Sequence, residues 1–330
     1  MKKTRIILIS FILIYSSCTK KPDIQFNNPH DPLADNYTLP WKTLKPMLFE
    51  RCYFTAETVN HKIYMIGAAS GYIEEYDPVN EESSIKLTAS AYRSGLASSV
   101  VNNKIYLIGG MINITGTDCT NLVEEYDPVN NTITCKTPMP TARAGLACVA
   151  VEGKIYAIGG YDRSRNILST VEEYNPDTDT WTTKTPMSSV RCYLSCTVYK
   201  DKIYAVGGSL RYNSYNEFSD KLEVYDPINN TWSYKASISS PRGELCCKTI
   251  NNKIYVFGGK GFFYSPVSIV QEYDPENNSW KEKTPIKTDI TGMSSAVFNN
   301  KIYIIGGYQY GPNKTIILDL VEEYDPSFDQ

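Results

Sequence analysis

One short phrase recurs along the chain and restricts the folds that the chain can adopt. The phrase "KIYLIGG", residues 104–110, is followed by an acidic segment that ends in tyrosine, "EEYDP", at residues 124–128. Copies of the first phrase begin at Lys62, Lys154, Lys202, Lys253 and Lys301. The copies are 42 to 51 residues apart, and each has its own acidic segment. Repeats of this period indicate similar structural units that bury their apolar faces against one another.

Each unit has the composition of β-strands. "SVVNNKIYLI", residues 99–108, joins two β-rich runs through Asn102-Asn103, and asparagine tolerates the positive φ of a two-residue hairpin turn. The double glycine allows a strand to end where a Cβ would collide with neighbouring backbone. Seven residues after the tyrosine, three units carry Trp181, Trp232 and Trp280, whose rings can fill the space between adjacent sheets. These patterns predict an all-β fold.

The repeated segments resemble the kelch repeat, and the resemblance covers residues 41–330. It implies a β-propeller, in which each blade is a sheet of four antiparallel strands and the blades surround a central channel. Six copies predict six blades. A seven-bladed ring that has been cut short is the alternative.

Trp41 stands before the first copy, yet it fits the spacing of the repeat. In the middle units ten residues separate the tryptophan position from the next arginine, as in Trp181 and Arg191. Trp41 and Arg51 have the same separation. The last repeat tyrosine, Tyr324, predicts a tryptophan position at 331, one residue past the end of the sequence. We therefore expect the N-terminal strand around Trp41 to complete the sixth blade and close the ring.

The first 17 residues have the features of an export signal. A basic head over residues 2–5 precedes an apolar run over residues 6–15, and two serines stand directly before Cys18. This segment resembles a bacterial lipoprotein signal, which implies cleavage and attachment of lipid, palmitate included, at Cys18; an ordinary cleaved signal is the alternative. Residues 18–40 are polar and proline-rich, which predicts a flexible tether before the propeller at 41–330. We expect an exported protein anchored in the bacterial cell envelope, on its periplasmic or surface side.

Propeller topology gathers the loops that follow each Gly-Gly and the loops that precede each arginine on one face, which we call the loop face. Loops held by a rigid scaffold often carry function. Aromatic rings stack on sugars or fill protein interfaces, and guanidinium groups pair with carboxylates. The candidate ligand-binding residues in these loops are Tyr161, Arg163, Arg165, Arg211, Tyr212, Tyr215, Phe262, Phe263, Tyr308 and Tyr310.

An arginine marks the entry of five innermost strands, near the mouth of the channel. These residues are Arg51, Arg93, Arg143, Arg191 and Arg242, and the sixth position is Ile290. One interpretation is a ring that attracts an anionic ligand. The other is structural, with each arginine paired to an acid of its own blade, such as Glu124, two residues before the tyrosine. Residues fixed by a repeat usually serve the repeat, so we favour the structural interpretation.

Eight cysteines follow Cys18. Cys148, Cys196 and Cys247 each lie five residues after an arginine, so they occupy equivalent points on different blades, which are too far apart for a disulfide. We expect them to be small packing residues. Cys119 and Cys135 lie within one unit, and a bridge between them is left open.

Composition narrows the function classes. Three of the 33 basic residues lie in the signal, so the rest of the chain has 30 basic and 36 acidic residues and a net charge of about −6. A negative net charge argues against nucleic acids as partners. His30 lies in the tether and His61 in an expected hairpin turn, so the loop face lacks the histidine of Ser-His or Cys-His catalysis. We expect a monomer with no metal and no cofactor, which contacts the membrane only through its lipid anchor.

Two function classes remain. The first is a non-catalytic binding module that presents its loop face to a glycan or protein ligand. The second is an enzyme that needs only acid and base groups. The resemblance extends to bacterial exported kelch proteins that interconvert sialic acid anomers, and Arg211 and Glu217 in one long loop offer such groups. We favour the binding module because no catalytic constellation stands out from the repeat.

Overall fold

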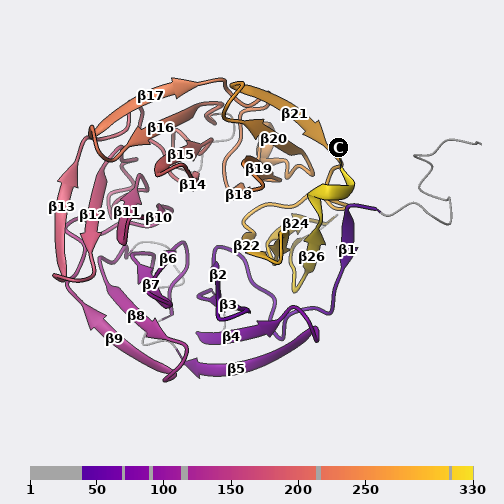
Figure 1. Cartoon of the computed structure of the whole chain (residues 1–330), viewed down its shortest axis with the longest axis horizontal. Helices are drawn as coiled ribbons and strands as arrows, with labels where there is room; N and C mark the ends of the chain where they lie inside the picture. Colours follow the sequence, from indigo (N-terminus) through magenta and orange to yellow (C-terminus); the bar gives the residue numbers. More distant parts are fainter. Residues whose placement is uncertain are drawn as a thin grey trace, which may run out of the picture. The chain divides into compact units, whose positions relative to one another are not determined.

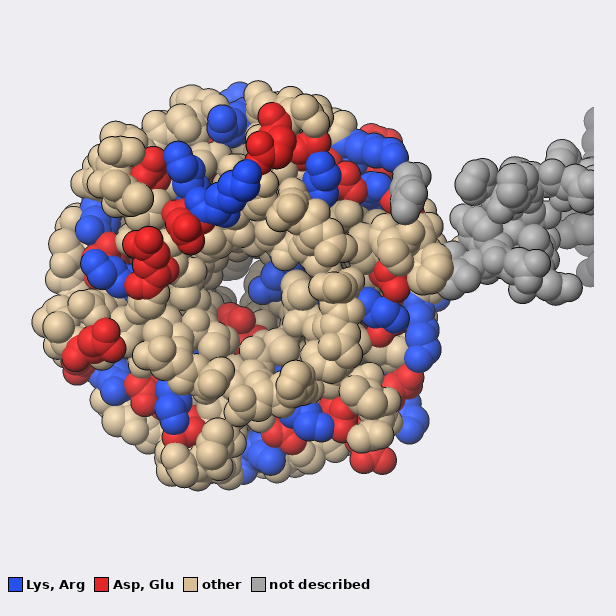
Figure 2. All heavy atoms as spheres, in the orientation of Figure 1, with Lys and Arg blue, Asp and Glu red and all other residues tan. Residues whose placement is uncertain are grey.

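The strands of the protein are arranged as blades around a ring. The computed structural model describes residues 39–68, 71–88, 92–112, 118–212, 217–311 and 314–329. In these residues the strands form six four-stranded antiparallel sheets and one two-stranded hairpin. The chain passes from blade to blade around the ring (Figure 1), and one face of the ring carries many acidic and basic side chains and an opening at its centre (Figure 2). The predicted six-bladed β-propeller is confirmed.

The blades follow the sequence repeat. Blade 1 contains β2 (Thr55–Val59), β3 (Lys62–Ile66), β4 (Tyr72–Asp77) and β5 (Glu82–Thr88). Blade 2 contains β6 (Ala97–Val101), β7 (Lys104–Ile108), β8 (Val123–Asp127) and β9 (Thr132–Lys136). Blade 3 contains β10 (Ala147–Val151), β11 (Lys154–Ile158), β12 (Val171–Asn175) and β13 (Thr180–Lys184). Blade 4 contains β14 (Ser195–Tyr199), β15 (Lys202–Val206), β16 (Leu222–Asp226) and β17 (Thr231–Lys235).

The last two blades complete the ring. Blade 5 contains β18 (Cys246–Ile250), β19 (Lys253–Phe257), β20 (Val270–Asp274) and β21 (Ser279–Lys283). Blade 6 contains β22 (Ser294–Phe298), β23 (Lys301–Ile305), β26 (Val321–Tyr324) and β1 (Trp41–Thr43). A small hairpin, β24 (Tyr308–Tyr310) and β25 (Thr315–Ile317), lies in a loop of blade 6, and two short 3-10 helices cover Phe262–Tyr264 and Pro326–Phe328.

The turn residues adopt the conformations that the repeat predicted. Asn102 and Asn103 have φ values of 51° and 58°, and Asn251-Asn252 and Asn299-Asn300 repeat this left-handed pair. Gly109 also has a positive φ, and a Cβ at this position would lie 2.5 Å from the carbonyl oxygen of Arg143 in the next blade. The Gly-Gly corners therefore let neighbouring blades approach closely.

The N-terminal strand closes the ring as predicted. Trp41 of β1 pairs with Tyr324 of β26, the same register that joins Trp181 to Tyr174 in blade 3. The Trp41 indole N–H donates to the carbonyl oxygen of Thr284 in blade 5 at 3.0 Å. The equivalent tryptophans Trp181, Trp232 and Trp280 each donate to a carbonyl of their own preceding blade, at 2.7 to 2.9 Å. Trp41 is therefore the outer-strand tryptophan of blade 6.

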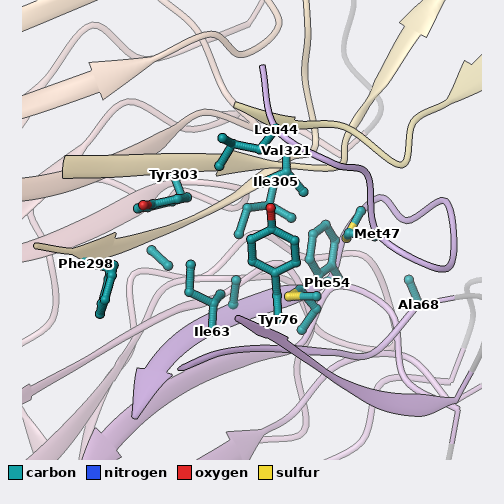
Figure 3. Packing of buried hydrophobic residues seen from close by; sticks show 13 residues of the cluster. Leu44, Met47, Phe54, Ile63, Ala68, Tyr76, Phe298, Tyr303, Ile305 and Val321 are labelled. Atoms are coloured by element: carbon teal, nitrogen blue, oxygen red, sulfur yellow. The ribbon is translucent and has the colours of Figure 1, made fainter. Parts of the chain in front are cut away.

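The chain after β1 seals the contact between the last blade and the first. The Leu44 and Met47 N–H groups donate to the carbonyls of Val321 and Asp319. Their side chains pack in a buried cluster with residues of both blades, among them Phe54, Ile63, Tyr76, Phe298, Tyr303, Ile305 and Val321 (Figure 3). The first and last repeats are thus joined both by backbone hydrogen bonds and by apolar burial.

Replacing Trp41 by alanine should destabilise the whole ring. Trp41 is 5% exposed, and removal of a buried tryptophan side chain costs about 3 to 5 kcal/mol. We expect a clearly lower thermal unfolding midpoint for Trp41→Ala. Lys42→Ala is the matched control on the same strand, because the Lys42 side chain forms an exposed ion pair with Glu81, an interaction worth about 0 to 1 kcal/mol. An unchanged midpoint for Trp41→Ala would contradict closure by β1.

Candidate functional site on the loop face

Six equivalent residues form a closed ring of backbone hydrogen bonds at the loop-face mouth of the channel. Each lies two residues after the arginine position of its blade. The N–H of each donates to the carbonyl oxygen of the corresponding residue in the preceding blade, at 2.7 to 3.1 Å. The members of this mouth ring are Tyr53, Gly95, Gly145, Tyr193, Glu244 and Gly292. The hydrogen bonds link all six blades, since Tyr53 of blade 1 donates to Gly292 of blade 6.

All six residues of the mouth ring have a positive φ. Glycine accepts this conformation without strain, and three blades use it. Tyr53, Tyr193 and Glu244 have φ values of 56°, 52° and 55°, a left-handed conformation that costs a residue with a side chain about 1 to 2 kcal/mol. Strain of this kind is often retained at functional sites. These three side chains therefore mark the channel mouth as the first place to seek a function.

The carboxylate of Glu244 is the centre of a polar cluster. It accepts hydrogen bonds from the hydroxyls of Tyr53 and Tyr308, both at 2.9 Å, and from Thr291 at 3.2 Å. The ammonium of Lys260 lies 2.5 Å from its other oxygen, and both charged side chains are less than 10% exposed. We call these five residues the Glu244 cluster. It combines a carboxylate, an ammonium group and three hydroxyl donors on the axis of the propeller.

A row of tyrosine rings crosses the loop face through this cluster. Neighbouring ring centroids are 4.8 to 5.7 Å apart. In spatial order the rings belong to Tyr310, Tyr308, Tyr53, Tyr193, Tyr161 and Tyr212. Burial, with the nearby Glu244 carboxylate, raises the pKa of Tyr53 and Tyr308 above its ordinary value, so both hydroxyls stay protonated and act as donors.

A wider recess lies at the Tyr212 end of the row, between the loops of blades 3 and 4. It has a volume of about 610 Å³ and is lined by Arg165, Asn166, Ile167, Val190, Leu210, Arg211 and Tyr212. The Arg165 guanidinium lies 5.0 Å from the centroid of the Tyr212 ring. We call this space the arginine recess. It offers one aromatic face, two cationic groups and an aliphatic wall.

The repeat geometry and the sequence comparisons agree on the family. Residues 38–208 and 95–307 match the model of the KLHDC2/KLHL20/DRC7 Kelch-repeats domain, and residues 290–330 match the Kelch motif. The chain belongs to the kelch-repeat family.

One known protein resembles a short part of this kelch propeller in sequence, and one solved structure resembles most of it in fold. Alpha-scruin of Limulus polyphemus is 46% identical over 41 residues, which are 12% of this chain and 4% of that protein. The chain thus matches only a small part of that relative. The solved structure of YjhT superposes with a TM-score of 0.74 at 17% identity and covers 84% of this chain and 96% of that one. At this identity the likeness concerns the fold alone.

The arginine positions of the kelch blades are structural, as favoured from the sequence. Their side chains are 0 to 1% exposed, so the interpretation as an anion-attracting ring is wrong. Four of them form buried ion pairs with the expected glutamate, namely Arg51–Glu74, Arg93–Glu124, Arg143–Glu172 and Arg191–Glu223. Arg242 donates instead to the Gln271 side chain. Arg191 also donates to the carbonyls of Ala205, Gly207 and Lys221, which ties strand ends of one blade together.

Two of the candidate rings are not exposed, contrary to the expectation from the sequence. Tyr161 is fully buried and Tyr308 is 5% exposed. The residue after each Gly-Gly forms a β-bridge with the segment that enters the innermost strand of the same blade, Tyr161 with Ala144 and Tyr308 with Thr291, which directs the ring into the tyrosine row. Arg163 also has a local role, because its Nε donates to the carbonyl of Cys119.

The remaining candidates lie nearer the solvent. Phe262, Phe263 and Tyr310 are 52%, 82% and 49% exposed, and Arg165, Arg211 and Tyr212 line the arginine recess. Arg211 and Glu217 form an exposed ion pair at 3.1 Å. Tyr215 lies outside the described residues. The structure therefore brings the blade 3 and blade 4 candidates together and leaves those of blades 5 and 6 on separate loops.

The cysteines after Cys18 are all free thiols. Cys119 is buried near Tyr161, and Cys135 is exposed on β9, so the bridge left open from the sequence is not formed. Cys148, Cys196 and Cys247 occupy equivalent places on three innermost strands and line the channel.

Sequence reasoning missed most of the Glu244 cluster. One clue was present in the sequence. The position two residues after each arginine position is glycine in three units, whereas the other three units have Tyr53, Tyr193 or Glu244 there. Lys260 directly follows a Gly-Gly, but nothing in the sequence pairs it with a residue 16 positions earlier.

The Glu244–Lys260 pair should be strongly coupled. Loss of one partner of a buried ion pair costs about 3 to 5 kcal/mol because the other charge is left unpaired. We expect Glu244→Gln and Lys260→Met each to lower the thermal unfolding midpoint, and the double variant to regain much of the loss. Glu276→Gln is the matched control, because Glu276 pairs with Lys200 in solvent. Additive losses in the double variant would show that the two side chains do not stabilise each other.

Proposed function

We propose that this kelch propeller is an exported binding module whose loop face binds an acidic glycan. The observation that carries the proposal is the arginine recess, in which Arg165, Arg211 and Tyr212 surround a space of about 610 Å³. An aromatic ring next to cationic groups suits a sugar that bears a carboxylate. The kelch fold itself supports a binding or interaction role.

Each wall of the recess has a counterpart in such a ligand. Tyr212 is held by its contact with Tyr161, so its ring is a fixed platform on which the apolar face of a sugar can stack. The Arg165 guanidinium is positioned over Tyr212, and Arg211 is 71% exposed, so both can reach a carboxylate. Ile167, Val190 and Leu210 supply apolar contacts. The exposed rings of Phe262, Phe263 and Tyr310 extend the surface available to a longer glycan.

A second candidate function is the interconversion of sugar anomers by acid–base catalysis without a metal. The Glu244 cluster favours it, because a carboxylate and the hydroxyls of Tyr53 and Tyr308 lie within hydrogen-bond distance of one another at the channel mouth. Mutarotation requires one proton acceptor and one donor beside the sugar ring. The Arg211–Glu217 pair, first considered for these roles, is exposed to solvent. The Glu244 cluster is therefore the better candidate for this chemistry.

One experiment tests both functions. Proton NMR of sialic acid with the purified full chain reports binding through saturation transfer and anomer exchange through the two anomeric signals. We expect saturable binding that Tyr212→Ala and Arg165→Ala each weaken by about tenfold, the loss of one stacking or charged contact. Lys281→Ala, an exposed change on the outer strand β21, should have no effect.

The outcomes separate the alternatives. Exchange that is accelerated by the wild type and abolished in Glu244→Gln would support the second function, and an unchanged exchange rate would remove it. No binding of sialic acid, together with silence on a glycan array, would contradict the glycan proposal and favour a protein ligand.

Export and anchoring through Cys18 are part of this proposal. The signal at residues 1–17, Cys18 and the tether up to residue 38 lie outside the described residues, and no helix among the described residues has the length and apolarity to cross a bilayer. We expect the wild-type chain in the membrane fraction of bacterial cells. The Cys18→Ala chain should either lie in the soluble fraction of the envelope or keep its signal uncleaved. Equal distribution of the two chains, with the signal removed from both, would exclude the lipid anchor.

A further inference from the structure

The propeller channel has a second chamber behind the mouth ring. Directly below the mouth ring, each blade contributes one apolar side chain, and together these form a collar. The collar residues are Phe54, Leu96, Leu146, Leu194, Leu245 and Met293. The innermost strands run from the loop face to the hairpin turns, so space beyond the collar faces the opposite side of the ring. Two adjoining cavities of about 140 and 250 Å³ occupy that space.

The walls of this inner chamber are polar and carry two opposite charges. Hydroxyl groups come from Ser98, Ser195, Thr197 and Ser295 among others. Glu57 of blade 1 and Lys248 of blade 5 are the charged residues that line both cavities in the described part of the chain. Figure 2 looks into the ring and shows a red and a blue surface inside the central opening. The chamber is therefore open to solutes and has a cationic and an anionic wall.

The repeat does not require these two charges. Glu57 and Lys248 pair in register with Tyr64 and Tyr255, the tyrosines of their "KIY" segments. The equivalent positions in the other blades hold Ser99, Val149, Thr197 and Ala296. Blades therefore form equally well with small or apolar residues here, unlike at the buried arginine positions.

The two charges do not satisfy each other. The Glu57 carboxylate accepts a hydrogen bond from the Ser98 hydroxyl at 2.7 Å. Among the described residues, no carboxylate lies within 4.0 Å of the Lys248 ammonium, although Lys248 is only partly exposed. A charge withdrawn from bulk water without a partner is costly. A solute that carries both an ammonium and a carboxylate group would compensate both walls at once.

We propose that the inner chamber binds a small zwitterion of the α-amino acid class. Its ammonium group pairs with Glu57, its carboxylate pairs with Lys248, and the serine and threonine hydroxyls complete its hydrogen bonds. A water molecule takes about 30 Å³ of liquid volume, so the chamber has room for a solute of several heavy atoms in place of water. The neighbouring thiol of Cys148 adds no charge, because burial raises its pKa to about 12. This site is independent of the glycan proposal, since the collar separates it from the loop face.

Titration of the full chain with free amino acids tests the proposal. Each α-amino acid is added singly and binding is followed by isothermal calorimetry, with propionate and ethylamine as single-charge analogues of alanine. We expect at least one amino acid to bind saturably, and the analogues to bind at least tenfold more weakly. Glu57→Gln and Lys248→Met should each weaken binding at least tenfold, whereas Lys248→Arg should retain it.

Matched controls keep the result interpretable. Glu82→Gln and Lys281→Met remove the same charges from exposed outer strands of the same two blades and should leave binding unchanged. Unfolding midpoints of the channel variants establish that they fold.

The proposal would be overturned if no amino acid bound saturably up to about 10 mM, which corresponds to a binding free energy weaker than about −3 kcal/mol. Equal binding of propionate, or loss in Lys248→Met alone, would identify a simple anion site and would also overturn it. Sialic acid binding by Glu57→Gln should match the wild type, so failure of one site is distinguishable from failure of the other.

Discussion

The propeller depends on an antiparallel pairing between the two ends of its chain. Trp41 and Tyr324 face each other in one sheet although 283 positions separate them in sequence. Until that pairing forms, blade 1 and blade 6 each leave an apolar face uncovered, and the cluster around Leu44, Met47 and Val321 cannot assemble. Contacts so distant in sequence are slow to form because loop closure precedes any gain from packing. The buried arginine–glutamate pairs stabilise individual blades, whereas the pairing of β1 with β26 joins the six blades into a closed ring.

The fold was predictable because the repeat states each structural requirement several times. Three features recur in several copies: asparagine pairs at hairpin turns, glycine pairs at close approaches of the backbone, and tryptophans seven residues after tyrosine. Their recurrence allows each to be assigned to a structural feature of the blade. The arginine–glutamate pairing was likewise predictable, because each residue keeps its own place in the repeat in four blades: the arginine stands eleven residues before the lysine of "KIY", and the glutamate stands two residues before the tyrosine. The position of Trp41 followed from the same offsets. Repetition thus makes long-range contacts visible in a single sequence.

The candidate sites were less predictable, because functional residues deviate from the repeat. Tyr161 and Tyr308 looked like exposed loop residues, but the bridge that follows each Gly-Gly turns them inward. Tyr53, Tyr193 and Glu244 stand next to the arginine positions, and their importance arises from the left-handed backbone, which no single residue type reveals. The pairing of Lys260 with Glu244 joins two loops at one end of blade 5, and the opposition of Glu57 to Lys248 depends on side chains from distant blades. Sequence periodicity gives no information on such pairs.

The ring of hydrogen bonds at the channel mouth determines what kind of recognition can occur there. Every N–H of the mouth ring is already bound to the neighbouring blade, so no backbone donor is left to hold an anion or a carbonyl group. A ligand on the axis can meet only side chains, and in three of the six blades the mouth-ring residue itself is a glycine and provides none. The backbone scaffold is close to sixfold symmetric, yet the polar side chains of the Glu244 cluster lie on one part of the mouth ring. New ligands can therefore be accommodated by exchanging glycine for another residue at the mouth, without any change in the path of the backbone.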